Sequence, residues 1–484
     1  MKSSGTPAKP PIITFADGSS ALIAAAVRAM SIFLSMPSQW RTLKLISFID
    51  AFVGAAVKYG VPRIMAIPDN FTKGGDEEAE FRRIVEGMKK LVAKAAKHGI
   101  TVTVDVLPQA IELAKLCREK RIPVVAGGIG IASDPDTARP HFDAICIGPA
   151  EGHWPQLLAD VQRGALKREY VTGADLKGES LAAPDFSFAD PVQCLYGNVI
   201  AASRGCPFAC DFCYNSTPGM RGRYLHRTVE SVMDEIRSKG VRHVMFIDDN
   251  FIGDIAFARA LIEAMRPLRL KWNAAVSANI VDHPDLLDLM RETGCQSLFV
   301  GFESINAGSL AGVHKRQNDV ARYERLVEML HSRSIMINAS FVFGLDSDGP
   351  SVFKDTLEWI VRNRIETVTS HILTPYPGTA LYERMRAEGR LTDDNLSNYD
   401  TAHVVFKPKC MTAQELYDGY LWIYREVYSW KNILRRTPKS LSQFVPYYLF
   451  NLFYRKYGRF TERLGDRIGF DRVGAWARRL SYWR

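Results

Sequence analysis

The chain has 484 residues, of which 47% are hydrophobic and 24% charged, and its formal net charge is +9 at pH 7. This length allows two or three domains with substantial cores, and the composition is that of a globular protein. The eight cysteines are too few and too unevenly spread for a disulfide framework, and no cleavable signal peptide is recognisable, so we expect a cytoplasmic protein. No uncharged apolar stretch reaches the ~18 residues of a transmembrane helix.

The N-terminal third divides into two regions. Residues 1–60 begin with a polar lead and continue with apolar segments of helical spacing at 19–36 and 43–59, which predict a helical segment that is either packed or lies at a membrane surface. From 61 to 166 short strands alternate with helices, which predicts a parallel sheet of Rossmann-like type. The expected strands are 63–67, 101–107, 122–126 and 143–147, and the expected helices are 77–98, 109–121 and 154–163.

Residues 167–193 carry mixed charge, Gly and Pro with little periodicity, so we interpret them as a linker. From 194 to 410, strands and helices alternate at intervals of roughly 30 residues, the size of a βαβ unit. The expected strands are an apolar run leading to Ser203, then 243–247, 271–278, 297–302, 335–343 and 367–373; the expected helices are 228–239, 255–265, 284–293, 321–332 and 352–362. In parallel barrels the active-site groups lie at the carboxyl ends of the strands, where the polar signatures of this region fall.

The C-terminal region, 411–484, is predicted to be helical at 413–428 and then becomes basic and aromatic. Residues 431–484 contain thirteen Lys or Arg and three Asp or Glu, so this segment carries the whole positive excess. Such a mixture suits the surface of an anionic membrane or a cap over the barrel opening. Nucleic acid ranks behind both, because a nucleic-acid-binding protein usually spreads basic charge over its body.

Three cysteines, Cys206, Cys210 and Cys213, fall within eight residues on a loop that Gly205 and Pro207 keep from forming a regular helix or strand. Closely spaced thiolates suit zinc or an iron–sulfur cluster. A structural zinc site takes four ligands, and no fourth Cys or paired His follows at finger-like spacing. A cubane cluster also normally takes four thiolates, so three would leave one iron open for chemistry. A zinc-binding interaction protein is the alternative from another functional class.

The pattern C-x3-C-x2-C, with Phe212 before the last cysteine, resembles the cluster loop of the radical S-adenosylmethionine (radical SAM) superfamily. The resemblance implies a [4Fe–4S] cluster on the three cysteines and S-adenosylmethionine (SAM) on the open iron, cleaved reductively to a 5′-deoxyadenosyl radical. It also implies a partial (β/α)6 TIM-like barrel, here preceded by the Rossmann-like domain and followed by the helical region. An electron donor such as flavodoxin or ferredoxin would be the redox partner.

The resemblance assigns further cofactor contacts at strand ends. The backbone of Phe212 would lie against adenine, and the backbone at Gly344 would let adenine approach closely. The amino group of SAM would be bound by Asp248, Asp249 and Asn250, and the ribose hydroxyls by Glu303. Tyr376 would line the barrel mouth. Asp and Asn also favour a helix N-cap, a glycine also suits a plain turn, and a glutamate also serves as a surface ion-pair partner. These alternatives stay open at this point.

Residues 61–166 resemble the cobalamin-binding domain attached to many radical SAM enzymes, most clearly at 124–128 and 142–152. No Asp-x-His-x-x-Gly cobalt-ligand motif occurs in the chain. With cobalamin, the resemblance implies a C-methyltransferase acting on a small, hydrophobic or lipid-like substrate. Without it, the same barrel would catalyse rearrangement, cyclisation or oxidation. A transfer RNA methylthiotransferase is a weaker rival, because the N-terminal domain lacks that family's own cluster cysteines.

Overall fold

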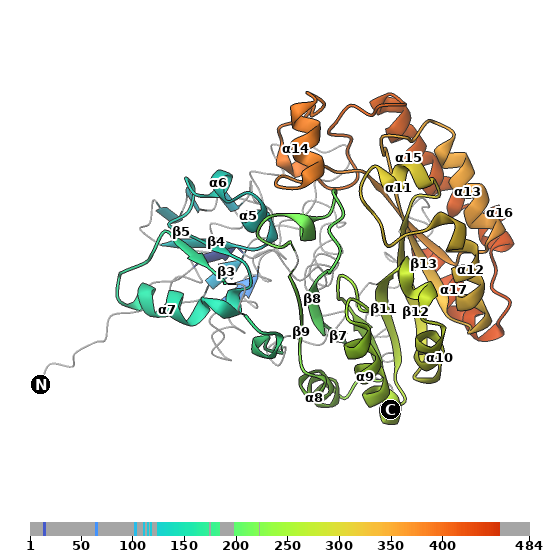
Figure 1. The fold of residues 1–484 in the computed structure, drawn as a ribbon, viewed down its shortest axis with the longest axis horizontal. Coiled ribbons are helices and arrows are strands. Elements are labelled where there is room, and N and C mark those ends of the chain that lie inside the picture. Colours follow the sequence, from blue (N-terminus) through green and yellow to red (C-terminus); the bar gives the residue numbers. More distant parts are fainter. Residues whose placement is uncertain are drawn as a thin grey trace, which may run out of the picture. The chain divides into compact units, whose positions relative to one another are not determined.

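The computed structural model describes residues 13–15, 63–65, 101–103, scattered positions from 110 to 118, 123–173, 176–183, 198–221 and 223–454. The chain forms two compact units (Figure 1): residues 1–176 with 184–197, and residues 177–183 with 198–484. The helices predicted at 19–36, 43–59 and 77–98 lie outside the described residues, and the one at 109–121 is described only in part.

The first unit contains a parallel sheet in the order β1-β4-β5-β6. Its strands are β1 (Ile13–Phe15), β4 (Val124–Gly127), β5 (Ala144–Ile147) and β6 (Glu169–Val171), while β2 (Arg63–Met65) and β3 (Thr101–Thr103) form a separate parallel pair. The short helices α5 (Ile129–Ser133) and α6 (Pro135–Ala138) follow β4, and α7 (Trp154–Gln162) follows β5. Leu157 of α7 packs with Val125, Cys146 and Tyr170 in the core of this unit. The predicted parallel sheet is confirmed.

Two strands of this sheet were not expected from the sequence. β1 falls within residues 1–60, which were predicted to be helical, and β6 falls within the predicted linker 167–193. Each has three residues, too few to show a period. β6 is instead fixed by tertiary contacts: it pairs with β5, and Tyr170 is buried with its hydroxyl donating to Asp160 at 2.9 Å. The linker prediction was wrong at these residues.

In its described part, the second unit is built on a six-stranded parallel sheet in the order β14-β13-β12-β11-β10-β7. The strands are β7 (Val199–Ile200), β10 (His243–Phe246), β11 (Lys271–Ser277), β12 (Cys295–Glu303), β13 (Met336–Phe343) and β14 (Thr367–Ile372). Because β7 and β14 are edge strands that do not pair with each other, this sheet is open. Each strand corresponds to one predicted from the sequence. Because all six strands are parallel, their carboxyl ends lie at one edge of the sheet.

Helices connect consecutive strands of this sheet, as Figure 1 shows. They are α8 (Val229–Lys239), α9 (Ile255–Met265), α10 (Pro284–Glu292), α12 (Tyr323–Ser332) and α13 (Val352–Arg362), with the short α11 (Ala307–Ala311) after β12. The local signals are visible at α8: the Thr228 side chain accepts the N–H of Ser231 at 3.1 Å, and Gly240 ends the helix with φ 59°.

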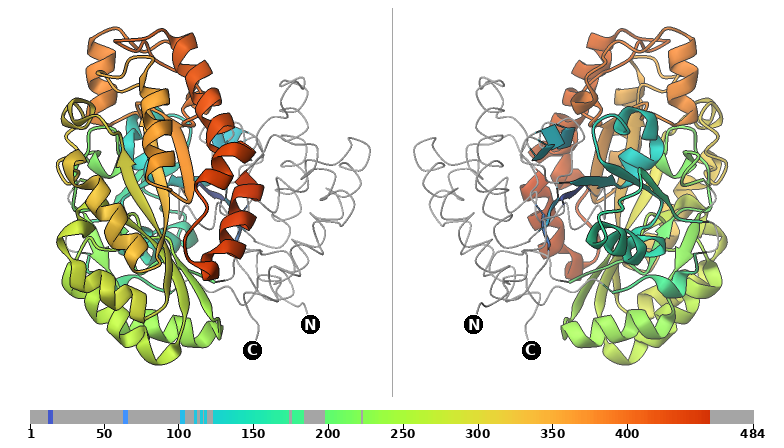
Figure 2. Two further views of the ribbon diagram at one scale, coloured as in Figure 1. Left: turned by 90° about the vertical axis from the view of Figure 1, so that its right-hand side faces the viewer. Right: turned by 90° about the vertical axis from the view of Figure 1, so that its left-hand side faces the viewer.

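The C-terminal helices are α14 (Ala380–Ala387), α15 (Ala413–Val427), α16 (Trp430–Arg435) and α17 (Phe444–Tyr454). Figure 2 shows α15, α16 and α17, in orange and red, along the β14 side of the sheet. α15 begins with a capping box formed by Thr412 and Glu415, and the Tyr428 hydroxyl donates to the Val368 carbonyl of β14 at 2.5 Å. The predicted helical region is confirmed as far as residue 454. Among the described residues, no helix is both long and apolar enough to cross a membrane.

Candidate functional site: the cysteine loop at the strand ends

The cysteine loop, residues 206–213, follows the short strand β8 (Ser203–Gly205), which pairs antiparallel with β9 (Tyr224–His226). Gly205 has φ 84°, and a Cβ added there would lie 1.9 Å from the Arg223 carbonyl oxygen. Only glycine meets both conditions, because other residues are strained at this φ and their side chain would collide with the backbone. Gly205 therefore sets the direction in which the loop leaves the strand pair.

The three cysteines of the loop form no disulfide, with Cys210 buried and Cys206 and Cys213 partly exposed. Burial raises the pKa of Cys206 and raises that of Cys213 to about 12, and the neighbouring thiols and Asp249 act in the same direction on both. Among the residues that the structure describes, no three His, Cys, Asp or Glu side chains converge tightly enough for a single metal ion. The three thiols interact electrostatically with one another, and three soft donors on one loop suit an iron–sulfur cluster.

Asp211, inside the loop, anchors it to two distant parts of the chain. Its carboxylate accepts from His314 Nδ1 and from Arg384 Nη1 of α14, both at 2.9 Å, and its backbone N–H donates to the Val313 carbonyl at 3.1 Å. The Leu381 N–H donates to the Asp211 carbonyl at 3.0 Å. Sequence reasoning missed these contacts, because their partners lie 103 and 173 residues further along the chain and share no motif with the loop.

Residues 313–318, which we call the 313–318 segment, lie against the cysteine loop. Gln317 Nε2 donates to Cys210 Sγ at 3.3 Å, and Lys315 Nζ lies 5.8 Å from the centre of the Phe212 ring. Asn318 fixes the end of the segment by donating to the Gly301 and Phe302 carbonyls at 2.8 and 2.9 Å. Sequence analysis assigned no role to Lys315 or to Gln317.

The polar residues after β10 face different partners. Asp248 is buried and accepts from the Ala202 N–H at 3.3 Å and from the backbone and hydroxyl of Ser203; burial raises its pKa to about 6. Asn250 is also buried, and its Nδ2 donates to Ser277 Oγ at 3.1 Å. Asp249 is exposed beside the cysteine loop.

The carboxylate of Asp249 accepts from the Gly205 N–H at 3.1 Å and from the Tyr214 hydroxyl. The N-cap of α9 is Asp254, which accepts the Phe257 N–H at 2.9 Å, so the N-cap interpretation of residues 248–250 was wrong. Of these three residues, Asp249 is therefore the one whose carboxylate faces solvent next to the thiols.

Glu303 ends β12 with φ 62° and forms a buried ion pair with Lys315, with 2.5 Å between Oε1 and Nζ. A Cβ at Gly301 would lie 2.6 Å from the Glu303 carboxylate and 3.2 Å from Lys315 Nζ, so this glycine leaves the room for the pair. Burial acts to lower the pKa of Lys315, but Glu303 and the Cys210 and Cys213 thiols together raise it. The surface ion-pair interpretation of Glu303 was wrong, because both side chains are buried.

The last two predicted residues lie at the ends of β13 and β14. Gly344 has φ 96°, and a Cβ there would lie 2.7 Å from the Leu416 side chain of α15. Its N–H donates to Asp348 at 3.1 Å. The turn and the close packing are enough to require glycine here, as the plain-turn interpretation expected. Tyr376 is half-buried, and its carbonyl accepts from Thr379, the N-cap of α14.

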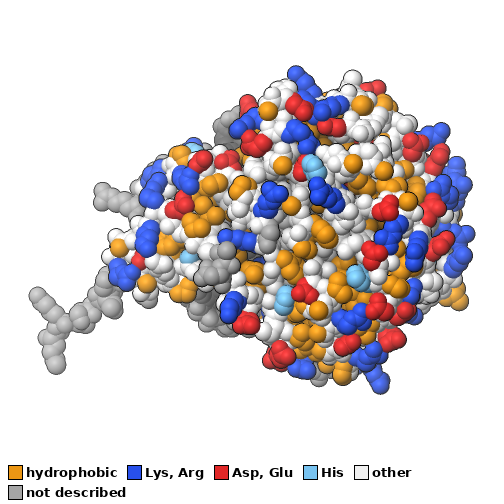
Figure 3. Space-filling view, in the orientation of Figure 1, with side chains coloured by type: hydrophobic (Ala, Val, Ile, Leu, Met, Phe, Trp, Pro, Cys, Tyr) orange, Lys and Arg blue, Asp and Glu red, His pale blue; other side chains and the backbone are white. Residues whose placement is uncertain are grey.

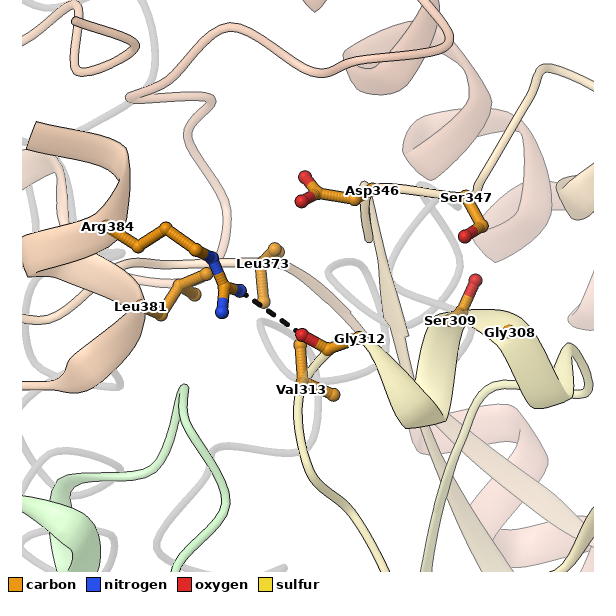
Figure 4. A pocket seen from close by; sticks show the side chains of 9 residues that line it. All are labelled: Gly308, Ser309, Gly312, Val313, Asp346, Ser347, Leu373, Leu381 and Arg384. Atoms are coloured by element: carbon orange, nitrogen blue, oxygen red, sulfur yellow. Dashed lines mark hydrogen bonds between the residues drawn. The ribbon is translucent and has the colours of Figure 1, made fainter. Parts of the chain in front are cut away.

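A small hollow that is open to solvent lies beside this edge of the sheet, between α11, α14 and the ends of β13 and β14 (Figure 4). Arg384 reaches into it and donates to the Gly312 carbonyl at 3.3 Å. Its lining residues are Gly308, Ser309, Gly312, Val313, Asp346, Ser347, Leu373, Leu381 and Arg384. The enclosed space has room for about one water molecule, so it does not hold a large substrate.

Two family models match the chain: the radical SAM superfamily over residues 200–360, and a domain of unknown function (DUF4070) over residues 379–456. Bacteriochlorophyllide d C-12(1)-methyltransferase of Chlorobaculum tepidum is 33% identical over 347 residues, covering 69% of this chain and 75% of that protein. The chain belongs to the radical SAM superfamily. It is therefore an enzyme of the family that uses a [4Fe–4S] cluster and SAM, and the resemblance drawn from the cysteine loop is confirmed.

Two further proteins that are similar to this radical SAM enzyme are methyltransferases. Hopanoid C-2 methylase of Rhodopseudomonas palustris is 30% identical over 312 residues, covering 60% of this chain and 58% of that protein. The structure of the radical SAM methyltransferase TsrM of Kitasatospora setae, with tryptophan and a SAM analogue, matches with a TM-score of 0.54 at 16% identity, covering 79% of this chain and 76% of that one. At that identity the likeness shows a common fold, which agrees with the predicted α/β class.

Proposed function

We propose that this radical SAM enzyme is a cobalamin-dependent C-methyltransferase acting on a hydrophobic, polycyclic small molecule. The observation that carries the proposal is the 33% identity to a bacteriochlorophyllide methyltransferase across three quarters of that protein, in a chain that retains the three-cysteine loop. The relatives named for tetrapyrrole and hopanoid methylation share one substrate property, a large apolar ring system. We extend that property, and no individual substrate, to this enzyme.

We assign the cluster to Cys206, Cys210 and Cys213. When bound, the cluster supplies the electron that cleaves SAM and an open iron that SAM occupies. Asp249 is our candidate for the SAM amino group, because an ammonium needs an acceptor and this carboxylate is exposed beside the thiols. Glu303 is our candidate for the ribose hydroxyls, with Lys315 holding its carboxylate in place.

The remaining assignments carried from the sequence concern adenine and the barrel mouth. We propose the backbones of Phe212 and Gly344 for adenine and the side chain of Tyr376 for the mouth. Phe212 is held against the core beside Lys315, and the backbone turn at Gly344 is fixed by Asp348. Asp248 and Asn250, whose polar groups are bonded within the protein, position the strand end that carries Asp249.

Cobalamin is proposed for the first unit. The carboxyl ends of its neighbouring strands β4 and β5 are followed by Gly128 and Gly148, with φ 109° and 86°. Glycines at adjacent strand ends expose the backbone in the crevice where α/β sheets bind ligands. A TsrM structure containing cobalamin and a [4Fe–4S] cluster matches with a TM-score of 0.50 at 17% identity, covering 68% of this chain and 67% of that one, and provides the precedent for this pairing of folds.

Anaerobic reconstitution with iron, sulfide and cobalamin tests the proposal. We expect about four irons and one cobalamin per chain, 5′-deoxyadenosine after addition of SAM and dithionite, and transfer of label from methyl-labelled SAM to a polycyclic acceptor. The Cys206→Ala variant should lose its iron, whereas Cys410→Ala, at an exposed cysteine outside the loop, should keep the iron content of the wild type. One bound zinc without iron would refute the cluster assignment.

A reaction without cobalamin, such as cyclisation, is the second candidate, because the chain lacks an Asp-x-His-x-x-Gly cobalt-ligand motif. The chain is also 26% identical over 235 residues to a protein of Cereibacter sphaeroides named as an anaerobic magnesium-protoporphyrin IX monomethyl ester cyclase, which bears on the type of reaction and not on the cofactor. That match covers 47% of this chain and 38% of the cyclase. Iron and 5′-deoxyadenosine without bound cobalamin or methyl transfer would favour this candidate. We propose a flavodoxin or ferredoxin as the electron donor, tested by replacing dithionite with either protein.

We also propose that the C-terminal region contacts an anionic membrane peripherally. Among the described residues, six of the eight large apolar side chains that are exposed belong to this region: Trp430, Leu434, Leu441, Val445, Leu449 and Phe450. The same region carries the positive excess, while acidic and basic side chains are interspersed over the face shown in Figure 3. Apolar side chains combined with basic charge bind anionic bilayers.

Vesicle co-sedimentation tests the membrane contact. The enzyme should bind phosphatidylcholine vesicles that contain phosphatidylglycerol more strongly than vesicles that lack it. Val445→Ser should weaken this binding, while Val171→Ser, at a side chain of similar exposure in the first unit, should not. Equal binding to both kinds of vesicle, or to neither, would argue against the contact.

A further inference from the structure

The hydrogen bond between Gln317 and Cys210 joins the 313–318 segment to the most buried thiol of the cysteine loop. Gln317 Nε2 lies 3.3 Å from Cys210 Sγ, within the range of an N–H donor to sulfur. Cys210 is 5% exposed, so few waters compete for its sulfur. A side-chain donor that reaches a buried thiol through a contact spanning 107 residues is specified by tertiary packing alone.

The donor is held in place from both sides of the segment. Lys315 is fixed by its ion pair with Glu303, and Asn318 is fixed by the Gly301 and Phe302 carbonyls. Gln317 is therefore pre-positioned by residues that do not themselves bond to the thiol. This rigidity means that the donor does not have to reorganise when the charge on the sulfur changes.

A hydrogen-bond donor on a ligand sulfur changes the electron affinity of an iron–sulfur cluster. One-electron reduction adds negative charge, part of which resides on the ligand sulfurs, and an N–H dipole pointing at the sulfur stabilises that charge. Removing the donor should lower the reduction potential. The cation at Lys315 is also near, but the carboxylate of Glu303 lies 2.5 Å from it and offsets its field. The N–H dipole of Gln317 is not offset in this way, so it stabilises negative charge on the Cys210 sulfur more directly than Lys315 does.

We propose that Gln317 raises the reduction potential of the [4Fe–4S] cluster by donating a hydrogen bond to Cys210 Sγ, and so eases the electron transfer that precedes SAM cleavage. The inference rests on the proposed assignment of Cys210 as a cluster ligand. Gln317 is a tuning residue in this scheme: it acts on the cluster through Cys210 and takes no part in the reaction itself.

The test is an anaerobic redox titration of the reconstituted full-length enzyme, followed by the electron paramagnetic resonance signal of the reduced cluster, without SAM. Gln317→Leu keeps the size of the side chain and removes the donor. At a fixed potential we expect its ratio of reduced to oxidised cluster to fall by about tenfold, which corresponds to ~59 mV for one electron. Gln317→Glu, which replaces the donor by a carboxylate, should lower the ratio further.

Gln296→Leu is the matched control, because Gln296 donates to the Gly294 carbonyl at 3.2 Å near the amino end of β12, away from the cysteine loop. Its titration should coincide with that of the wild type. An unchanged potential in Gln317→Leu would overturn the proposal, and so would loss of iron in that variant, which would show that Gln317 holds the loop. Cys210→Ala tests the ligand assignment separately from the tuning role of Gln317: if this variant retains four irons, Cys210 is not a cluster ligand.

Discussion

The buried ion pair between Glu303 and Lys315 offers a direct measure of how firmly the site is held. Only 10% of the Glu303 side chain and 9% of the Lys315 side chain are exposed. Lys315→Met keeps the apolar stem and removes the charge, which leaves a buried carboxylate without its cation. Breaking a buried pair in this way costs about 3–5 kcal/mol. At roughly 2 °C per kcal/mol for a domain of this size, the melting temperature should fall by about 6–10 °C.

A double-mutant cycle separates the pair from the packing around it. Glu303→Gln combined with Lys315→Met replaces both charges by neutral groups of similar size, so the double variant should recover most of the lost stability. The assay is thermal unfolding of the apo enzyme followed by circular dichroism. Lys354→Met is the control, because Lys354 forms an exposed 3.9 Å pair with Glu358 that is worth well under 1 kcal/mol. A cost below ~1 kcal/mol for Lys315→Met would refute the argument, since it would mean that water reaches the pair.

Three further substitutions test the loop and the C-terminal region. Gly205→Ala places a Cβ 1.9 Å from a carbonyl oxygen and should abolish iron incorporation. Its control, Gly389→Ala, lies at φ 63° but in open space and should be tolerated with only a small loss of stability. Equal iron content in the two variants would contradict this prediction. Arg384→Met removes an anchor of the loop and should speed the loss of iron to a chelator, measured by absorbance, while the exposed Arg386→Met should not. Arg436→Met should destabilise the second unit by about 3 kcal/mol or more, because the buried guanidinium donates to five oxygen atoms. Hydrogen exchange should then rise in α17, and unchanged exchange would show that the helix is held by other contacts.

The sequence by itself determined the framework of the second unit. Alternating apolar periods gave the six strands, and the helices α9 and α13 begin and end at the residues predicted for them. These features are local, because a helical or strand period, a cap and a terminating glycine all act within a few residues. The cysteine loop could also be predicted from the sequence, since its three thiols are close together in the chain. Its chemistry follows from residue type and spacing.

Only the tertiary structure decided which way the polar side chains at the strand ends face. Asp248 and Asp249 are adjacent in the sequence, yet one is buried against Ser203 and the other is exposed beside the thiols. Glu303 was foreseen as a site residue, but its lysine partner was not, and Gln317 gave no signal at all. The physical reason is the range of the interactions: a hydrogen bond or ion pair that spans tens to hundreds of residues leaves no periodic trace in the chain, and it exists only once the sheet has brought its partners together.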